Sequence, residues 1–159
     1  MIRVTSDVVV RAIDRGDVRA AAQLVHDGSL SPDAEHPERT DAYWSAVLET
    51  RRRSGEVLVA SRGDEVVGVC QLIVFPHFQH TGGWCAELES VHVRSDLRGR
   101  GVGTMLLAKA EELARERGCY RVQLTSRNVR HDAHRFYVQN GFELTSQGFK
   151  KLLVGGDLA

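Results

Sequence analysis

The sequence predicts a mixed α/β protein that forms one domain. Short apolar or alternating runs typical of strands take turns along the chain with segments of helical periodicity. A glycine-rich turn joins a strand expected over residues 84–93 to a helix expected over residues 102–117. The length of 159 residues is usual for a single domain, which buries about two thirds of the surface of its unfolded chain. We therefore expect one domain over residues 1–159.

The first third of the chain predicts one strand and two helices. A strand is expected over residues 8–12, and a helix over residues 14–25, where apolar residues recur three and four positions apart and Asp27-Gly28 marks the end. A second helix is expected over residues 38–53. The arginine run at its C-terminal end complements the helix dipole, which favours a solvated cap over a binding patch.

The following segments predict the start of a central sheet. Strands expected over residues 57–60 and 66–75 flank Arg62-Gly63-Asp64, which is typical of a hairpin turn. A loop is expected over residues 76–83, before the next strand. These strands are consecutive along the chain, so we expect them to be neighbours in the sheet.

Charge and cysteine content narrow the class of protein. The 21 basic and 21 acidic residues cancel, so no global field attracts nucleic acid or an anionic membrane, and neither is expected as a partner. Residues 1–7 are polar, unlike a signal peptide or a transmembrane segment, which predicts a cytoplasmic protein. Three cysteines without a Cys-x-x-Cys pair predict buried free thiols rather than a catalytic nucleophile.

The turn over residues 98–103, Arg-Gly-Arg-Gly-Val-Gly, is typical of a phosphate-binding site. A glycine-rich turn before a helix exposes backbone N–H groups at the positive end of the helix dipole. Thr104 stands where a Walker loop needs lysine, which excludes a nucleoside triphosphate site. The spacing of Gly101 and Gly103, with no acidic residue about twenty residues on, disfavours a nicotinamide cofactor. The pattern that remains is Arg-x-x-Gly-x-Gly.

A second motif lies near the C-terminal end. Residues 133–137 follow the pattern Ala-x-x-Phe-Tyr, and the helix expected there is followed by Gly141-Phe142. Together with the glycine-rich turn, this motif resembles the GNAT superfamily of acyl-CoA-dependent N-acetyltransferases, strongly over residues 57–153. The sequence of residues 128–137 is especially similar to that of the aminoalkylphosphonate N-acetyltransferases.

The resemblance implies a fold, an activity and partners. The expected fold is a twisted, mostly antiparallel sheet of about six to seven strands, flanked by about four helices and splayed at its middle strands. The expected activity is direct transfer of an acetyl group from acetyl-CoA to a primary amine within a ternary complex, without a metal ion. Relatives often form homodimers. A protein or peptide acceptor and a non-catalytic acyl-CoA-binding module are the alternatives.

The same resemblance implies which residues bind acetyl-CoA. The pantetheine arm is expected to pair, like an added strand, with the backbone of Val91, His92 and Val93. Relatives hold an asparagine seven residues before the tyrosine. Arg130 stands there in this chain, and Asn128, two positions earlier, is the candidate for that pantetheine contact. The pyrophosphate is expected at the turn, whose residues are Arg98, Gly99, Arg100, Gly101, Val102, Gly103 and Thr104.

The strand over residues 84–93 carries the candidate bases, Glu87 and Glu89. A carboxylate in an apolar run needs a reason, although strand glutamates also point to solvent or pair with arginine. Acetyl transfer needs a neutral amine, and a lysine-like amine is neutral in only about one molecule in 2500 at pH 7. A base that accepts its proton, directly or through water, restores the reactive form. The resemblance favours Glu87, and a bulge near Ser90 could change which carboxylate faces the cleft and so exchange the two roles.

Two further groups complete the expected reaction. A backbone N–H around Ser90 and Val91 would meet the negative charge that develops on the carbonyl oxygen. Tyr137 would protonate the departing CoA thiolate, and its alternative role is aromatic packing on an amphipathic helix.

Other polar residues receive weaker expectations. His77 and His80 have a spacing that could bind metal but lack a third ligand, so no zinc site is expected. Asp132 is expected to cap the helix that carries the Phe-Tyr pair. An anionic acceptor or the 3′-phosphate of CoA could meet the arginines around it, which are Arg127, Arg130 and Arg135.

Overall fold

The structure is a computed structural model that describes residues 4–155. The described chain separates into two compact units, one that ends at Leu124 and one that begins at Thr125. They are named here the sheet unit and the C-terminal unit. Within residues 4–155, no helix combines the length and the apolar character needed to cross a membrane.

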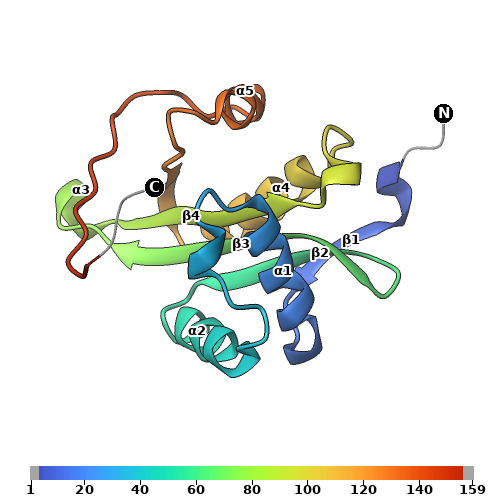
Figure 1. Cartoon of the computed structure of the whole chain (residues 1–159). Coiled ribbons are helices and arrows are strands. Elements are labelled where there is room, and N and C mark those ends of the chain that lie inside the picture. Colours follow the sequence, from blue (N-terminus) through green and yellow to red (C-terminus); the bar gives the residue numbers. More distant parts are fainter. Residues whose placement is uncertain (1–3, 156–159) are drawn as a thin grey trace. The chain divides into compact units, whose positions relative to one another are not determined.

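A five-stranded mixed sheet forms the centre of the sheet unit (Figure 1). The first three pairs of neighbouring strands are antiparallel, whereas the last pair is parallel and needs the crossover that a helix provides. Gly63, with a φ of 58°, makes the predicted tight turn between the strands that end at Arg62 and begin at Glu65. The strands follow chain order across the sheet and are β1 (Val8–Ala12), β2 (Glu56–Arg62), β3 (Glu65–Pro76), β4 (Trp84–Val93) and β5 (Cys119–Leu124).

Helices cover both faces of this sheet. α1 (Val18–Gly28) and α2 (Thr40–Arg52) lie on one face, and α4 (Val102–Glu116) lies on the other (Figure 1). The first helix starts later than predicted because Asp14 and Asp17 form a capping box around a short 3-10 turn. The short pieces are η1 (Val4–Asp7), η2 (Arg15–Asp17), η3 (Pro32–Ala34), α3 (Gln79–Gly82), which lies in the predicted loop, and η4 (Ser95–Leu97).

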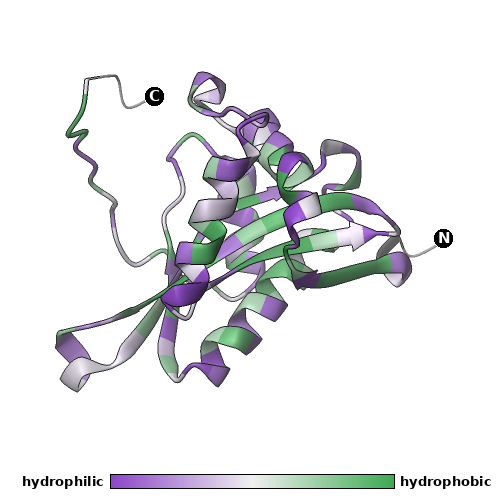
Figure 2. Cartoon of the chain, turned by 90° about the horizontal axis from the view of Figure 1, so that it is seen from below, coloured by the Kyte–Doolittle hydropathy of each residue, from purple (hydrophilic) through white to green (hydrophobic). Residues whose placement is uncertain are grey.

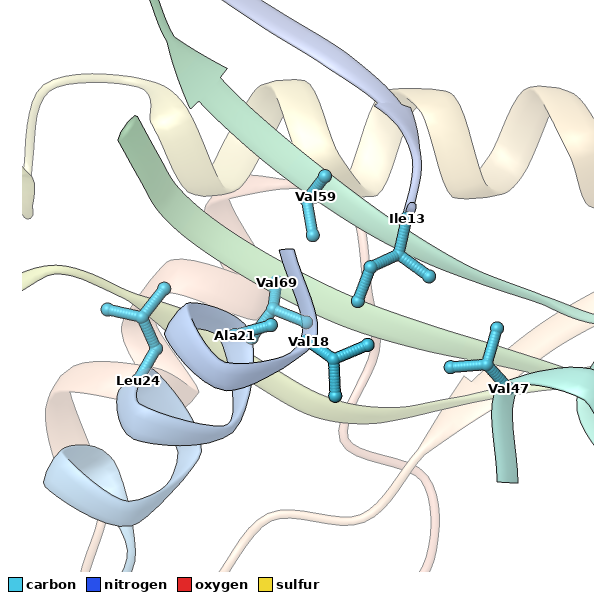
Figure 3. Close-up of a cluster of buried hydrophobic side chains, with 7 residues drawn as sticks. All are labelled: Ile13, Val18, Ala21, Leu24, Val47, Val59 and Val69. Carbon is cyan, nitrogen blue, oxygen red and sulfur yellow. The ribbon is translucent and has the colours of Figure 1, made fainter. Parts of the chain in front are cut away.

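One layer of the core joins α1 and α2 to the sheet (Figure 3). Helix and strand residues meet there because each element presents one apolar side, a pattern visible as alternating hydrophobic and hydrophilic bands along the helices in Figure 2. The buried members of this layer are Ile13, Val18, Ala21, Leu24, Val47, Val59 and Val69.

The second layer of the core lies under α4. A Cβ added to Gly68 would come within 3.0 Å of Leu106 and 3.3 Å of Val102, both on α4. Its neighbour Val69 belongs instead to the α1 layer. β3 therefore alternates between the two layers, as a strand covered on both faces must. The buried residues of α4 recur at helical spacing and are Val102, Leu106, Leu107, Ala110 and Ala114.

The C-terminal unit contains α5 (His131–Gln139). Residues 142–155 form neither helix nor strand, and Leu144, Phe149 and Leu153 are 86%, 90% and 92% exposed. The expectation of about six to seven strands is therefore wrong for the described chain, which has five. A strand exists only through the ladder it forms with a neighbour, and no such ladder includes residues 142–155.

Candidate functional site

The glycine-rich turn and the start of α4 present backbone N–H groups. Gly99 and Gly101 have φ angles of 70° and 90°, which glycine adopts without strain. Gly101 is the N-cap of α4, its carbonyl oxygen accepts from the N–H of Met105 over 3.1 Å, and its position provides no side-chain cap. The first turn holds no acidic residue, so the first N–H groups and the positive end of the dipole suit an anion. These features are what a pyrophosphate requires.

Arg98 connects this turn to the end of β4. Its Nε–H donates to the carbonyl oxygen of Val93 over 3.1 Å. η4 fills the short connection between the strand and the turn. The predicted cofactor residues 91–93 and 98–104 therefore form one continuous path, from the end of the strand to the start of the helix.

β4 contains a bulge at Ser90 and Val91, directly after Glu87 and Glu89, the two candidate bases. In its pairing with β3, His92 lies opposite Val69 and Glu89 lies opposite Gln71, so two residues of β4 face one residue of β3. Ser90, one of the two bulged residues, has a φ of 51°. The bulge re-aims the backbone N–H groups of this stretch, which is the condition that an oxyanion site needs.

β5 accompanies β4 for only part of its length. The register of this parallel pair ends at Leu88 opposite Leu124, while β4 continues to Val93. Beyond Leu88 the two strands no longer share a ladder, because β5 ends at Leu124. The part of β4 without this ladder includes the bulge at Ser90.

Glu87 and Glu89 lie on the face of the sheet that α1 and α2 cover. Glu89 is paired in register with Gln71, whose Nε2–H donates to Thr50 Oγ1 of α2 over 2.9 Å. Directly paired residues share a face, and alternation puts Glu87 on the same face. Both glutamates precede the bulge, so the bulge does not move either of them to the other face. Both carboxylates are half-buried, and Glu87 Oε2 accepts from Nε2–H of Gln123 over 2.8 Å.

His92 joins this row of polar side chains because of the bulge. Residues with odd numbers face α1 and α2 before the bulge, and the extra residue moves His92 to that face after it. A Cβ added to Gly28, the last residue of α1, would lie 2.2 Å from His92 Nδ1. The side chain of His92 therefore occupies the space that an alanine at position 28 would need. The sequence predicts a role for the backbone of His92 alone and gives no signal for Gln123.

Tyr137 is held by the C-terminal end of α5. Asn140 is the C-cap, Gly141 has a φ of 86°, and the N–H of Phe142 donates to the carbonyl oxygen of Tyr137 over 3.0 Å, which is a Schellman motif. The Phe142 ring packs edge-on to Tyr137 with centroids 5.8 Å apart, and Phe136 lies 5.2 Å away. The Gly-Phe pair after the helix thus fixes the tyrosine by backbone and ring together.

The start of α5 differs from the expectation. Arg130 is the N-cap, whereas Asp132 lies inside the first turn and forms an ion pair with Arg135. His134 Nε2 lies 2.9 Å from the carbonyl oxygen of Arg127 and orders the turn before the helix. The expected cap at Asp132 is therefore wrong. Asn128, the last predicted cofactor residue, is exposed in that turn.

The cysteines and loop histidines have ordinary packing roles. The three cysteines are free, and burial raises the pKa of Cys70 to about 12 and raises the pKa of Cys119. Neither is a thiolate at neutral pH. His77 Nδ1 lies 2.5 Å from the Tyr120 hydroxyl, and the His80 ring packs on the same tyrosine with centroids 4.2 Å apart. Within residues 4–155, no three His, Cys, Asp or Glu side chains are placed to share a metal ion.

Known proteins resemble this chain in sequence and in structure. The aminoalkylphosphonate N-acetyltransferase of Salmonella typhimurium is 38% identical over 60% of this chain and 61% of its own length. The glucosamine 6-phosphate N-acetyltransferase of Trypanosoma brucei brucei is 28% identical over 76% of this chain and 80% of its own length. A crystal structure described as a transcriptional regulator from Bacillus halodurans C-125 is 35% identical, with a TM-score of 0.84 over 92% of this chain and 99% of that protein.

The model of the Acetyltransferase (GNAT) family matches residues 21–142. This match confirms the resemblance carried by the glycine-rich turn and the Phe136-Tyr137 helix. At the level of the family it also confirms the expected enzyme class, an N-acetyltransferase with acetyl-CoA as cosubstrate. Because the match covers most of the chain, the protein belongs to the acetyltransferase (GNAT) family.

Proposed function

We propose that the protein transfers an acetyl group from acetyl-CoA to a small primary amine by direct attack in a ternary complex. One observation carries the proposal. β4 leads from the carboxylate of Glu87 through the bulge at Ser90 and, by way of η4, into the turn that opens α4. A carboxylate, a bulged backbone and a helix start suited to an anion thus follow one another along one stretch of chain, which supports the proposal.

The residues fit acetyl-CoA by their backbone more than by their side chains. The N–H groups of residues 100–104 hold the pyrophosphate, aided by the guanidinium of Arg98. The pantetheine amides pair with residues 91–93, on the side where β5 has ended. Asn128, in the turn before α5, is the side-chain candidate for a further pantetheine contact. The fit needs no metal ion.

Glu87 takes the proton of the attacking amine. A lysine-like amine at pH 7 loses about 4.6 kcal/mol by being mostly protonated, and a base in the bound complex recovers much of this. As the amine attacks, a backbone N–H at Ser90 or Val91 donates to the carbonyl oxygen, where negative charge develops. The C–S bond then breaks, and Tyr137 gives its phenolic proton to the thiolate of CoA. Glu89 is the alternative base.

The acceptor is a small amine that also carries a phosphonate or phosphate group. The acceptors named for two relatives, an aminoalkylphosphonate and glucosamine 6-phosphate, share a primary amine and a phosphorus oxyanion. Arginine suits such an anion because its planar fork donates two hydrogen bonds. The candidate anchors lie at the start of the C-terminal unit and are Arg127, Arg130 and Arg135.

A regulatory acyl-CoA-binding module is the second candidate, because a 35% identical protein is described as a transcriptional regulator. A binder has no use for a base and an acid, so turnover separates the two functions. We expect the purified protein to consume acetyl-CoA with aminoalkylphosphonates or amino sugar phosphates faster than with the same amines lacking the phosphorus group. Lysine peptides complete the panel and test a protein acceptor. Binding of acetyl-CoA without turnover on any amine would leave the module as the better account.

Several expectations about the whole protein stay predictions. They are a cytoplasmic location, no nucleic-acid or membrane partner, and a homodimer. A single domain over residues 1–159 also stays a prediction. It is supported by the family match over residues 21–142, which extends from the sheet unit into the C-terminal unit.

A further inference from the structure

Gln123 of β5 connects three side chains on the α1 and α2 face of the sheet. Its Nε2–H donates to Glu87 Oε2 over 2.8 Å. Its Oε1 accepts from Nε–H of Arg121 over 3.1 Å and from the thiol of Cys85 over 3.7 Å. The sheet register explains the grouping, because Glu87 is paired with Gln123 and Cys85 is paired with Arg121.

The neighbours fix the orientation of the Gln123 amide. A guanidinium can only donate hydrogen bonds, and an ionised carboxylate can only accept them. One orientation alone satisfies both, with the amide oxygen toward Arg121 and the amide nitrogen toward Glu87. The donor is therefore aimed at the carboxylate by a contact on its far side.

The absence of charge on this donor suits the proposed reaction. A lysine or arginine at position 123 would also donate to Glu87, but the ion pair would favour the ionised carboxylate strongly and weaken it as a proton acceptor. An aliphatic residue would leave the carboxylate without this hydrogen bond. A neutral amide restrains the carboxylate and leaves it able to take a proton.

We propose that Gln123 is a positioning residue that holds Glu87 for proton transfer, with Arg121 holding Gln123 in turn. This inference rests on the proposed function. Gln123 acts through Glu87 and does not itself exchange a proton. Its loss should therefore change the rate and the pH dependence of acetyl transfer, with little effect on acetyl-CoA binding.

The chain offers a matched control in α1. Gln23 Nε2–H donates to Asp27 Oδ1 over 2.8 Å, the same chemistry at the same distance, on an exposed helix surface. The hydrogen bonds from Gln23 and then from His26 lower the pKa of Asp27, which shows the direction in which an amide donor acts on a carboxylate. Gln23→Met removes this pair without touching the sheet face that holds Glu87.

Several titratable groups lie on or near the face that holds Glu87. On its own strand Glu87 shares its face with Cys85, Glu89 and His92, and β5 contributes Arg121. At this face β3 contributes residues without a titrating side chain, namely Gln71, Ile73 and Phe75. The C-terminal end of α1, with His26 and Asp27, approaches His92. The Gln23→Met control tests whether groups at this end of α1 contribute to the pH profile.

The experiment compares steady-state kinetics of Gln123→Met, Gln123→Glu and Gln23→Met with the parent across pH 5 to 9. In Gln123→Met, kcat should fall about tenfold or more, since a positioned base contributes roughly 10²- to 10⁴-fold. KM for acetyl-CoA should stay unchanged, and the acidic limb of kcat/KM should move to higher pH because the carboxylate has lost a donor. Gln123→Glu should move that limb further, since two adjacent carboxylates resist ionising together. Gln23→Met should change neither.

The outcomes distinguish a failure of the positioning role from a failure of the proposed function. An active parent together with a Gln123→Met variant of parental rate and parental pH profile overturns the positioning role alone. A loss of kcat with an unmoved acidic limb also overturns it and leaves a structural role. A parent without turnover on any amine of the panel overturns the proposed function instead. The hydrogen bond has its own readout, because the Gln123 side-chain amide protons should shift with pH in the parent and not in Glu87→Leu.

Discussion

At the scale of single residues, the absence of a Cβ atom at Gly28 makes room for the side chain of His92. The imidazole occupies the position where a side chain on Gly28 would begin. Gly28 has no positive φ, so its backbone conformation does not demand glycine. The glycine is explained by the need for space alone, because the side chain of His92 on β4 fills that space.

Gly28→Ala should therefore destabilise the protein by about 1–3 kcal/mol, because the added methyl forces His92 out of its place. In the background His92→Ala the same change should become neutral or stabilise by up to about 1 kcal/mol, since alanine is the better helix former. Urea unfolding of the four proteins measures this coupling as a double-mutant cycle. Equal effects of Gly28→Ala in both backgrounds would mean that the two residues do not interact.

Tyr137 and Glu87 separate an enzyme from a binder. Tyr137→Phe keeps the packing against Phe136 and Phe142 but removes the phenolic proton, so kcat should fall about 10²- to 10⁴-fold with acetyl-CoA binding nearly intact. Glu87→Gln should flatten the rise of kcat/KM with pH, and Glu89→Gln should do less. Parental turnover by all three variants across pH 6 to 9 would falsify the assignment of the base and the acid.

Single residues were predictable where their chemistry conflicts with their surroundings. Two carboxylates inside an apolar strand are such a conflict, and so is a glycine-rich turn before a helix. Gln123 gives no comparable signal, because a polar residue in a strand is ordinary until its neighbour is known. That neighbour depends on the register of β4 and β5, which are separated along the chain by α4.

At the scale of elements, the turn before α4 depends on two different glycines. Gly101 needs its left-handed conformation, with a φ of 90°, whereas Gly103 lies within the first turn of the helix. A side chain at Gly101 therefore costs backbone strain, while a side chain at Gly103 adds bulk without that strain. The two positions allow strain and bulk to be tested apart.

Gly103→Val should weaken acetyl-CoA binding at least tenfold, or about 1.4 kcal/mol, without lowering Tm, because valine blocks close approach to the backbone N–H groups. Gly101→Ala should lower both the affinity and Tm. The control is Gly118→Ala at the far end of α4, where φ is 72° and no atom lies within 4 Å of the added Cβ. It should lower Tm alone. Calorimetry that finds unchanged affinity in Gly103→Val would remove this turn from the site.

Elements were predictable where their pattern is local. The helix over residues 102–117 and the hairpin at Gly63 are confirmed nearly as predicted, since periodicity and turn residues specify them. The bulge at Ser90 was foreseen only as a condition, because no residue type demands it. The count of six to seven strands came from the resemblance alone, and the described residues form five, none of them over residues 142–155.

At the scale of the whole molecule, stability should depend on pH through Asp17. Arg11 of β1 donates to both carboxylate oxygens, over 2.6 and 3.1 Å, and chiefly this hydrogen bonding lowers the pKa of Asp17 below its ordinary 3.8. A lowered folded-state pKa gives stability that is complete above the unfolded value and is lost as pH falls through the folded value. Asp17→Asn should thus destabilise the protein at pH 7 and progressively less below about pH 4. Urea unfolding at pH 7 and pH 3 measures the difference, and an equal loss at both would contradict the linkage.

β5 ends before β4 does, and this difference affects the lifetime of the protein in the cell. Up to Leu88, β4 shares ladders with strands on both sides, and beyond it the ladder with β5 is missing. A strand held on one side opens more often, which admits hydrogen exchange and proteases. A cosubstrate that pairs there would act as a replaceable sixth strand, adding about 2.7 kcal/mol at a hundred times its Kd. The abundance of the protein should then follow the supply of acetyl-CoA, so that a starved cell loses the catalyst together with its substrate.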